Sequence, residues 1–215
     1  MSKLFNSNNL FMQTVDRFFT FCMLNVLTVA CCLPILTAGA ALAACHKAMQ
    51  EMLTDPEANA GKVYFQAFKK CFKQATIVWL INLPIFAFVF VDVLLLHYNF
   101  SGPMTIVTYI VLALVGVLTL GVDAFIFPMI CRYEDTLKNH FSNAFYLATH
   151  NLLQTIPLVI LSLCPLLIAV CSPFFFFKTA VLWIFIGISC IVFLQTQLVL
   201  PVLLKIEEAD EEPLE

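Results

Sequence analysis

The sequence predicts an all-α, polytopic membrane protein with about five transmembrane helices, and three observations support this prediction. Hydrophobic residues make up 61% of the 215 residues, whereas charged residues make up only 12%. The mean hydropathy is +0.94, and soluble domains are instead about half apolar and a quarter charged. Five apolar runs reach or approach the roughly 20 residues that a helix needs to cross a bilayer core.

The chain is expected to start with a polar lead-in over residues 1–17 and a first span over residues 18–36. Pro34 should bend or end this span, because proline lacks a backbone N–H and clashes with the preceding turn. Within and after the span lies a helix-break motif made of Asn25, Pro34, Thr37 and Gly39. Asn25, and Asn82 in the next span, are expected to form hydrogen bonds between helices.

Residues 38–73 are predicted to form two amphipathic helices at the cytoplasmic face. Thr37 is a suitable N-cap for the first helix. This helix is not expected to cross the bilayer, because the polar residues within it would be costly in hydrocarbon. The second helix, KVYFQAFKKCFK, is basic and aromatic and leads directly into the next span.

Four further spans are predicted over residues 75–96, 104–130, 152–171 and 179–203, followed by an acidic tail over residues 206–215. A polar connector over residues 132–142 separates the third span from the fourth. The whole chain is treated as a single membrane domain.

The orientation follows from the lysine and arginine residues near the span ends, which are more frequent on the cytoplasmic side. One side receives eight of these residues, among them Lys47, Arg132 and Lys205. The other side receives three, which are Lys3, Arg17 and Lys178. The sequence therefore predicts an N-terminus outside and a C-terminus in the cytoplasm.

A possible internal repeat relates the two hairpins. Residues 127–135 read FPMICRYED and residues 200–208 read LPVLLKIEE, with the proline, basic residue and acidic pair at equal spacing. Such a repeat would be parallel, with an axis along the membrane normal. The alternative is that inner helix ends commonly carry prolines and basic residues.

The nine cysteines are interpreted as small apolar residues, because six lie in apolar runs and none shows a metal-binding spacing. Neither a disulfide nor a metal site is expected. Residues 42–45 read LAAC, which is similar to a lipoprotein cleavage site. The preceding segment is too long for such a signal and lacks its basic start.

Asp123 is the candidate for an intramembrane polar site, because an ionisable group at this depth suggests function by default. Gln195 and Gln197 on the last span, or a snorkelling Arg132, are its possible partners. A structural polar contact is the alternative to proton or ion handling.

The cytoplasmic segment is the candidate surface for a partner or for lipid. Its small residues would permit close contact, its lysines would attract anionic lipid, and its phenylalanines would anchor it. Plain membrane anchoring is the alternative. The residues of this surface are Ala43, Ala44, Lys47, Lys62, Phe65, Phe68, Lys69, Lys70 and Lys73.

These features resemble the YesL-like family of bacterial membrane proteins, a domain of unknown function. The resemblance rests on the order of Asn25, the CLPI sequence at residues 32–35, Thr37, Gly39 and the aromatic-basic stretch. It continues at residues 127–128, 132–134, 138–139 and 144, and so covers nearly the whole chain. Ala40 departs from the pattern, where a proline is expected.

The resemblance implies an accessory protein of carbohydrate uptake, with the permease or ATPase subunits of an ABC-type sugar importer as partners. The sequence leaves two alternatives open: a small-solute transporter or channel, and a membrane sensor or chaperone without flux. No catalytic motif occurs, so an enzyme and a cofactor are not expected. A nucleic-acid partner is not expected either, because the chain is not basic overall.

Overall fold

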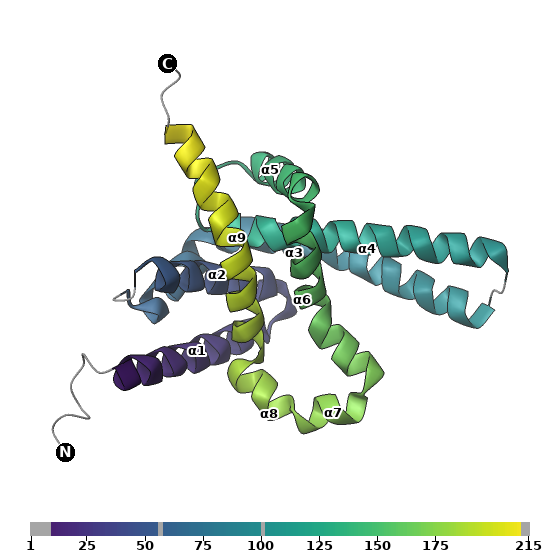
Figure 1. Ribbon diagram of the computed structural model, residues 1–215. Helices are drawn as coiled ribbons and strands as arrows, with labels where there is room; N and C mark the ends of the chain where they lie inside the picture. Colours follow the sequence, from purple (N-terminus) through teal and green to yellow (C-terminus); the bar gives the residue numbers. More distant parts are fainter. Residues whose placement is uncertain (1–9, 56–57, 100–101, 212–215) are drawn as a thin grey trace.

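The computed structural model describes residues 10–55, 58–99 and 102–211, and these ranges are helical almost throughout without any strand (Figure 1). The predicted all-α class is confirmed. In chain order the elements are α1 (Leu10–Cys32), η1 (Ile35–Thr37), α2 (Ala38–Thr54), α3 (Ala60–Asn99), α4 (Pro103–Ile130), α5 (Leu137–His150), α6 (Leu152–Cys171), α7 (Pro173–Lys178), α8 (Ala180–Leu182), η2 (Trp183–Gly187) and α9 (Ile188–Glu211).

Five helical stretches in these ranges are long and apolar enough to cross a membrane. They lie in α1, α3, α4, α6 and the continuous stretch from α8 to α9. The bounds of α6 equal the predicted 152–171, and α4 begins one residue before the predicted span. The last span differs from the prediction, because a π-helical segment, η2, interrupts it.

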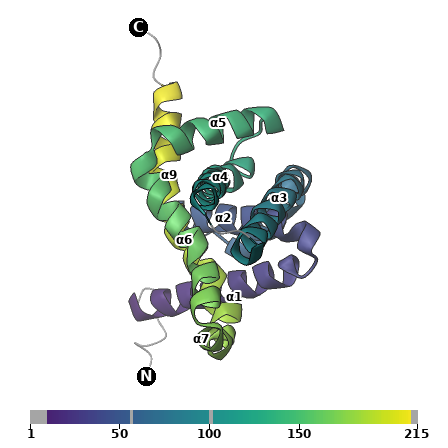
Figure 2. The same cartoon turned by 90° about the vertical axis from the view of Figure 1, so that its right-hand side faces the viewer.

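The α3–α4 hairpin projects away from the other helices (Figure 1). The view turned by 90° shows this hairpin nearly end-on, whereas α6 and α9 run from the top of the picture to the bottom (Figure 2). The helices therefore cross instead of forming one aligned bundle. The crossing leaves a central space into which several helices direct side chains.

Helix α2 lies at the centre of the molecule, where other helices cover it, so it is not the exposed amphipathic surface that the sequence predicts. Eleven of its residues are buried, including the polar His46 and Gln50. Gln50 donates from Nε2 to the Pro128 carbonyl oxygen near the end of α4 at 3.3 Å, whereas its Oε1 has no hydrogen-bond partner among the described residues. The polar stripe of α2 faces other helices instead of water.

Close packing between α2 and α3 depends on small residues. A Cβ atom built on Gly39 would lie 2.6 Å from both the Ala75 carbonyl oxygen and the Trp79 Cβ. Ala43 and Ala44 are fully buried in the same core. Small side chains let two helix backbones approach closely, so the alanines of α2 serve internal packing.

Helix α3 is one continuous helix of 40 residues, and the predicted amphipathic helix and second span are its two parts. At a rise of 1.5 Å per residue it is about 60 Å long. A bilayer core is about 30 Å thick. Much of α3 must therefore extend beyond the core, and its basic first third is the polar end.

The break between α1 and α2 occurs at the predicted position. Helix α1 ends at Cys32, and Pro34 precedes the short turn η1. The prediction that Thr37 caps α2 through its side chain is wrong, because the hydroxyl lies 2.6 Å from the Cys31 carbonyl oxygen. The Trp79 indole N–H donates to the Ile35 carbonyl oxygen at 2.7 Å and ties α3 to this turn.

Two features near the end of α4 differ from the predictions. Cys71 of α3 and Cys131 after α4 form a disulfide, with Cα atoms 5.6 Å apart, although no disulfide was expected. Sequence spacing could not reveal this pair, because 60 residues separate its members. Helix α5 occupies most of the predicted connector, and Thr136 caps it by accepting from the Asn139 N–H at 3.4 Å.

Candidate functional site

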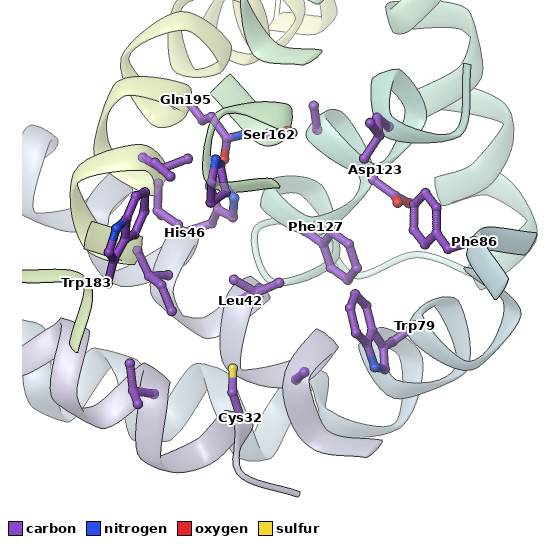
Figure 3. A pocket seen from close by; sticks show the side chains of 18 of the residues that line it. Cys32, Leu42, His46, Trp79, Phe86, Asp123, Phe127, Ser162, Trp183 and Gln195 are labelled. Atoms are coloured by element: carbon purple, nitrogen blue, oxygen red, sulfur yellow. Dashed lines mark hydrogen bonds between the residues drawn. The ribbon is translucent and has the colours of Figure 1, made fainter. Parts of the chain in front are cut away.

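A central cavity of about 630 Å³ lies between the crossing helices (Figure 3). Ligand pockets typically have volumes of about 300–1,000 Å³ and combine apolar walls with a few polar groups. Four polar side chains line this cavity, namely His46, Asp123, Ser162 and Gln195. They come from α2, α4, α6 and α9, so the cavity joins segments that are distant in the sequence.

Asp123 accepts a hydrogen bond at Oδ1 from Asn82 Nδ2, at a distance of 2.6 Å. Asn82 lies on α3 and is buried, so this contact also fastens the α3–α4 hairpin. The predicted contact between Asp123 and Arg132 is absent from the described residues, because Arg132 pairs with Glu207. The sequence correctly predicts an interhelical hydrogen bond for Asn82 but misses Asp123 as its partner.

His46 is buried, and its Nδ1 lies 3.3 Å from the Thr196 hydroxyl oxygen. The Thr196 hydroxyl donates its hydrogen to the Val192 carbonyl oxygen at 2.7 Å. Because a hydroxyl has one hydrogen, His46 Nδ1 must carry the proton of the contact, and Nε2 is left as an acceptor. Burial lowers the pKa of His46 to about 3, so the ring is neutral at physiological pH.

Gln195 lines the cavity, and its Nε2 donates to the Ser162 hydroxyl oxygen at 2.9 Å. Ser162 donates in turn to the Leu158 carbonyl oxygen at 3.0 Å. Gln195 therefore shares the cavity with Asp123, as predicted, although it does not bond to it. Gln197 is exposed on another face of α9, so its assignment to the same site is wrong.

A second cavity of about 480 Å³ lies on the other side of Asp123. Residues of α3, α4 and α5 line it, among them Asn82 and Ser142. Asp123 lines both cavities. The two cavities therefore share the Asp123 side chain, and its partner Asn82 lines the second one.

Asn25 of α1 holds the irregular part of the last span beside the cavity. Its Nδ2 lies 3.0 Å from the Trp183 carbonyl oxygen and 2.6 Å from that of Ile184. Its Oδ1 accepts from the Ser189 N–H at 2.7 Å. The predicted interhelical role of Asn25 is confirmed. Because Trp183 and Ile184 line the cavity, this amide helps to fix one of its walls.

Part of the candidate surface is exposed and part is buried. Ala43 and Ala44 are fully buried, so their assignment to a partner surface is wrong. Phe65 and Phe72 are 48% and 39% exposed. Phe68 is half-buried and stacks on Tyr64. Lys47 is half-buried and pairs with Glu51 at 3.0 Å, whereas the exposed lysines are Lys62, Lys69, Lys70 and Lys73.

Charged contacts connect α3, the segment after α4 and the end of α9. Arg132 donates from Nε and from an Nη atom to the two carboxylate oxygens of Glu207, each at 2.7 Å. Lys70 Nζ lies 2.6 Å from Glu134 Oε1, which lowers the pKa of the Glu134 carboxyl. A surface cleft of about 530 Å³ borders this region, with Lys70, Lys73 and Asp135 among its lining residues.

Sequence reasoning missed His46 and Ser162 as cavity residues. His46 was assigned to a surface helix, and Ser162 is a single hydroxyl inside an apolar run. The available signal was the presence of polar side chains within otherwise apolar stretches. In the described ranges, no group of three or more His, Cys, Asp or Glu side chains could hold a metal ion.

Residues 21–93 match a family described as "protein of unknown function, DUF624". The matched range covers about a third of the chain and includes most of α1, all of α2 and most of α3. It contains Asn25, His46 and Asn82 but ends before Asp123 and Gln195. No curated protein and no solved structure matches the chain.

Proposed function

We propose that this chain, whose residues 21–93 match a family of unknown function, is an accessory protein of carbohydrate uptake in the bacterial plasma membrane. Its N-terminus would lie outside and its C-terminus in the cytoplasm. The resemblance to YesL-like proteins supplies the link to an ABC-type sugar importer. Membrane lipids and the permease or ATPase subunits of that importer are the proposed partners.

The basic first third of α3 is the observation that carries this proposal. It projects beyond a bilayer core because α3 is about twice as long as the core is thick. Its exposed lysines and phenylalanines are available for contact. Lys73 also lines the polar cleft beside the connector after α4. An acidic surface on a partner protein complements this side of the molecule.

Co-purification from mild detergent tests the accessory role. The parent chain should recover a permease or ATPase subunit, and Lys73→Glu should reduce the recovery severalfold because it reverses a charge in the cleft. Lys205→Glu is the matched control, since Lys205 is exposed on α9 and does not line the cleft. Recovery of no importer subunit with the parent chain would contradict the proposal.

A small-solute transporter is the second candidate function, and the central cavity favours it. The cavity combines apolar walls with four polar side chains. Asp123 also lines the second cavity. Discontinuous helices line the substrate sites of many transporters, and η1 and η2 interrupt two of the helical stretches here. A sensor or chaperone without flux has no comparable observation in its favour.

Swelling of lipid vesicles that contain the purified chain tests the transport function. In isosmotic glucose, glycerol or ethylammonium chloride, vesicles should swell faster than protein-free vesicles in at least one solute. Asp123→Asn should change that rate, whereas Asp92→Asn should not, because Asp92 lies outside both cavities. Rates equal to those of protein-free vesicles in all three solutes would exclude this function for these solute classes.

A further inference from the structure

We propose that the central cavity binds an organic ammonium ion, a molecule with a protonated amine and an apolar body. This inference rests on the second function proposed above and names the class of its solute. It concerns equilibrium binding, so it can be tested without measuring flux. Three properties of the cavity support it: the hydrogen-bonding character of its polar groups, its charge and its walls.

The polar groups around the cavity offer acceptors to a ligand. Asp123 uses Oδ1 for Asn82, and Oδ2 has no hydrogen bond within the described part of the chain. His46 donates from Nδ1 to Thr196 and keeps Nε2 as an acceptor. Gln195 donates through Nε2, which leaves Oε1 as an acceptor. A ligand rich in N–H donors complements this set.

The charge of the cavity also favours a positively charged ligand. Asp123 is the one acidic side chain among the cavity-lining residues, and no lysine or arginine lines the cavity. The ion pairs found in the described ranges involve other residues. A carboxylate at this depth is costly without a partner. A ligand ammonium group would supply the missing positive charge.

Aromatic walls suit both parts of such a ligand. Phe86 lies beside the Asp123 carboxyl, with Phe127 and Trp79 next to them (Figure 3). Aromatic faces attract ammonium groups, and the attraction is stronger where water is excluded. The remaining lining is mainly aliphatic and can contact an apolar body. His46, Ser162 and Gln195 lie together in another part of the cavity (Figure 3).

Other occupants fit less well. An anionic ligand would face the Asp123 carboxyl and the acceptor atoms without a compensating cation. A lipid acyl chain would fill the apolar volume but would leave those acceptors unpaired, which costs free energy in a buried site. A neutral alcohol could donate one hydrogen bond but would not balance the charge.

Binding of three probes with the same ring tests the inference. Phenethylammonium, phenethyl alcohol and phenylacetate are titrated at neutral pH into the full chain in nanodiscs, with empty nanodiscs as the blank. Tryptophan emission follows binding, because the chain has two tryptophans, and both Trp79 and Trp183 line the cavity. Phenethylammonium should bind at least about tenfold more tightly than the alcohol, as expected for hydrogen bonds to charged groups.

Asp123→Asn should abolish this preference while the alcohol still binds, because the amide keeps the shape and loses the charge. Asp92→Asn, with the same chemical change outside the cavity, should keep the preference. Equal binding of amine and alcohol to the parent chain would indicate a site for lipid or neutral solutes and would overturn the inference. An unchanged preference in Asp123→Asn would also overturn it.

The two proposals can fail separately. If phenethylammonium binding depends on Asp123 and the vesicles do not swell, the proposed ligand class is supported. The transport function is then contradicted. If vesicles swell in glucose or glycerol while phenethylammonium does not bind, the transport function stands and the ligand class falls.

Discussion

Among single residues, Gly39 marks a position where α2 and α3 approach closely. Gly39→Ala would place a methyl group 2.6 Å from the Ala75 carbonyl oxygen, which belongs to the rigid backbone of α3. We expect the free energy of unfolding to fall by about 1–3 kcal/mol, as for other overpacked cores. Unfolding in mixed micelles measures this change.

Gly116→Ala is the matched control for Gly39→Ala. Gly116 is also inside a helix, but no atom lies within 4 Å of a Cβ built there. This control should be neutral or stabilising, because alanine is favoured over glycine in helices by about 1 kcal/mol. Equal losses in both variants would show that the contact with α3 is not the cause.

The burial of His46 predicts a pH dependence of stability. Burial lowers the pKa of His46 to about 3, whereas the ordinary value is about 6.5. Between these values the unfolded chain binds a proton that the folded chain excludes. The free energy of unfolding should therefore fall as the pH falls, by about 2 kcal/mol between pH 7 and pH 5 from this group.

Denaturation at pH 7 and pH 5 measures this effect. His46→Gln should remove most of the contribution of His46, and His150→Gln should not, because His150 is exposed. Some pH dependence should remain in the His46 variant, since burial also lowers the pKa of His140. A parent chain and His46 variant with the same pH dependence would contradict the expectation.

At the scale of elements, the π-helical segment η2 depends on one side chain of α1. Asn25→Ala would remove the donors to the Trp183 and Ile184 carbonyls and the acceptor for the Ser189 N–H. We expect a loss of about 1–3 kcal/mol in the free energy of unfolding, because buried polar groups lose their partner. The emission of Trp183 should change as well.

Gln197→Ala is the control for the asparagine variant. It also removes an amide, but from an exposed position on α9, so stability and emission should remain near those of the parent chain. If Asn25→Ala retains the parent's stability, the amide does not hold η2 in place.

The bounds of helices were easier to predict from the sequence than their surroundings. The uninterrupted apolar runs of α4 and α6 gave their bounds almost completely. The pattern of α2 shows a polar stripe but not what the stripe faces, and here it faces Thr196 and the Pro128 carbonyl. Amphipathic periodicity is the same for water and for a polar partner.

The candidate site was predicted only in part, for a related reason. Depth in the membrane suggested Asp123, Gln195 and Gln197, but depth does not give the direction of a side chain around its helix. Residues two apart on a helix point in nearly opposite directions, about 160° apart, since each residue turns the helix by about 100°. Gln195 and Gln197 therefore could not both face Asp123, and the structure selects Gln195.

For the whole molecule, the proposed orientation predicts which positions an impermeant reagent reaches. Lys69→Cys lies on the basic part of α3, and Met104→Cys lies at the start of α4, where Met104 is 79% exposed. An impermeant maleimide should label position 104 in intact cells. It should label position 69 only after the cells are lysed. The parent chain gives the background from native cysteines, and the reverse pattern would invert the topology.

The central position of α2 has a consequence for the order of events during synthesis. Its polar partners follow much later in the chain, Pro128 by 78 residues after Gln50 and Thr196 by 150 residues after His46. At about 5–20 residues per second, the ribosome needs roughly 8–30 s to reach Thr196 after His46. During that time α2 has an apolar side and an unsatisfied polar side, which is the pattern of a helix at a membrane surface. We therefore expect the nascent α2 to stay at the interface and to enter the core only when α9 has been made.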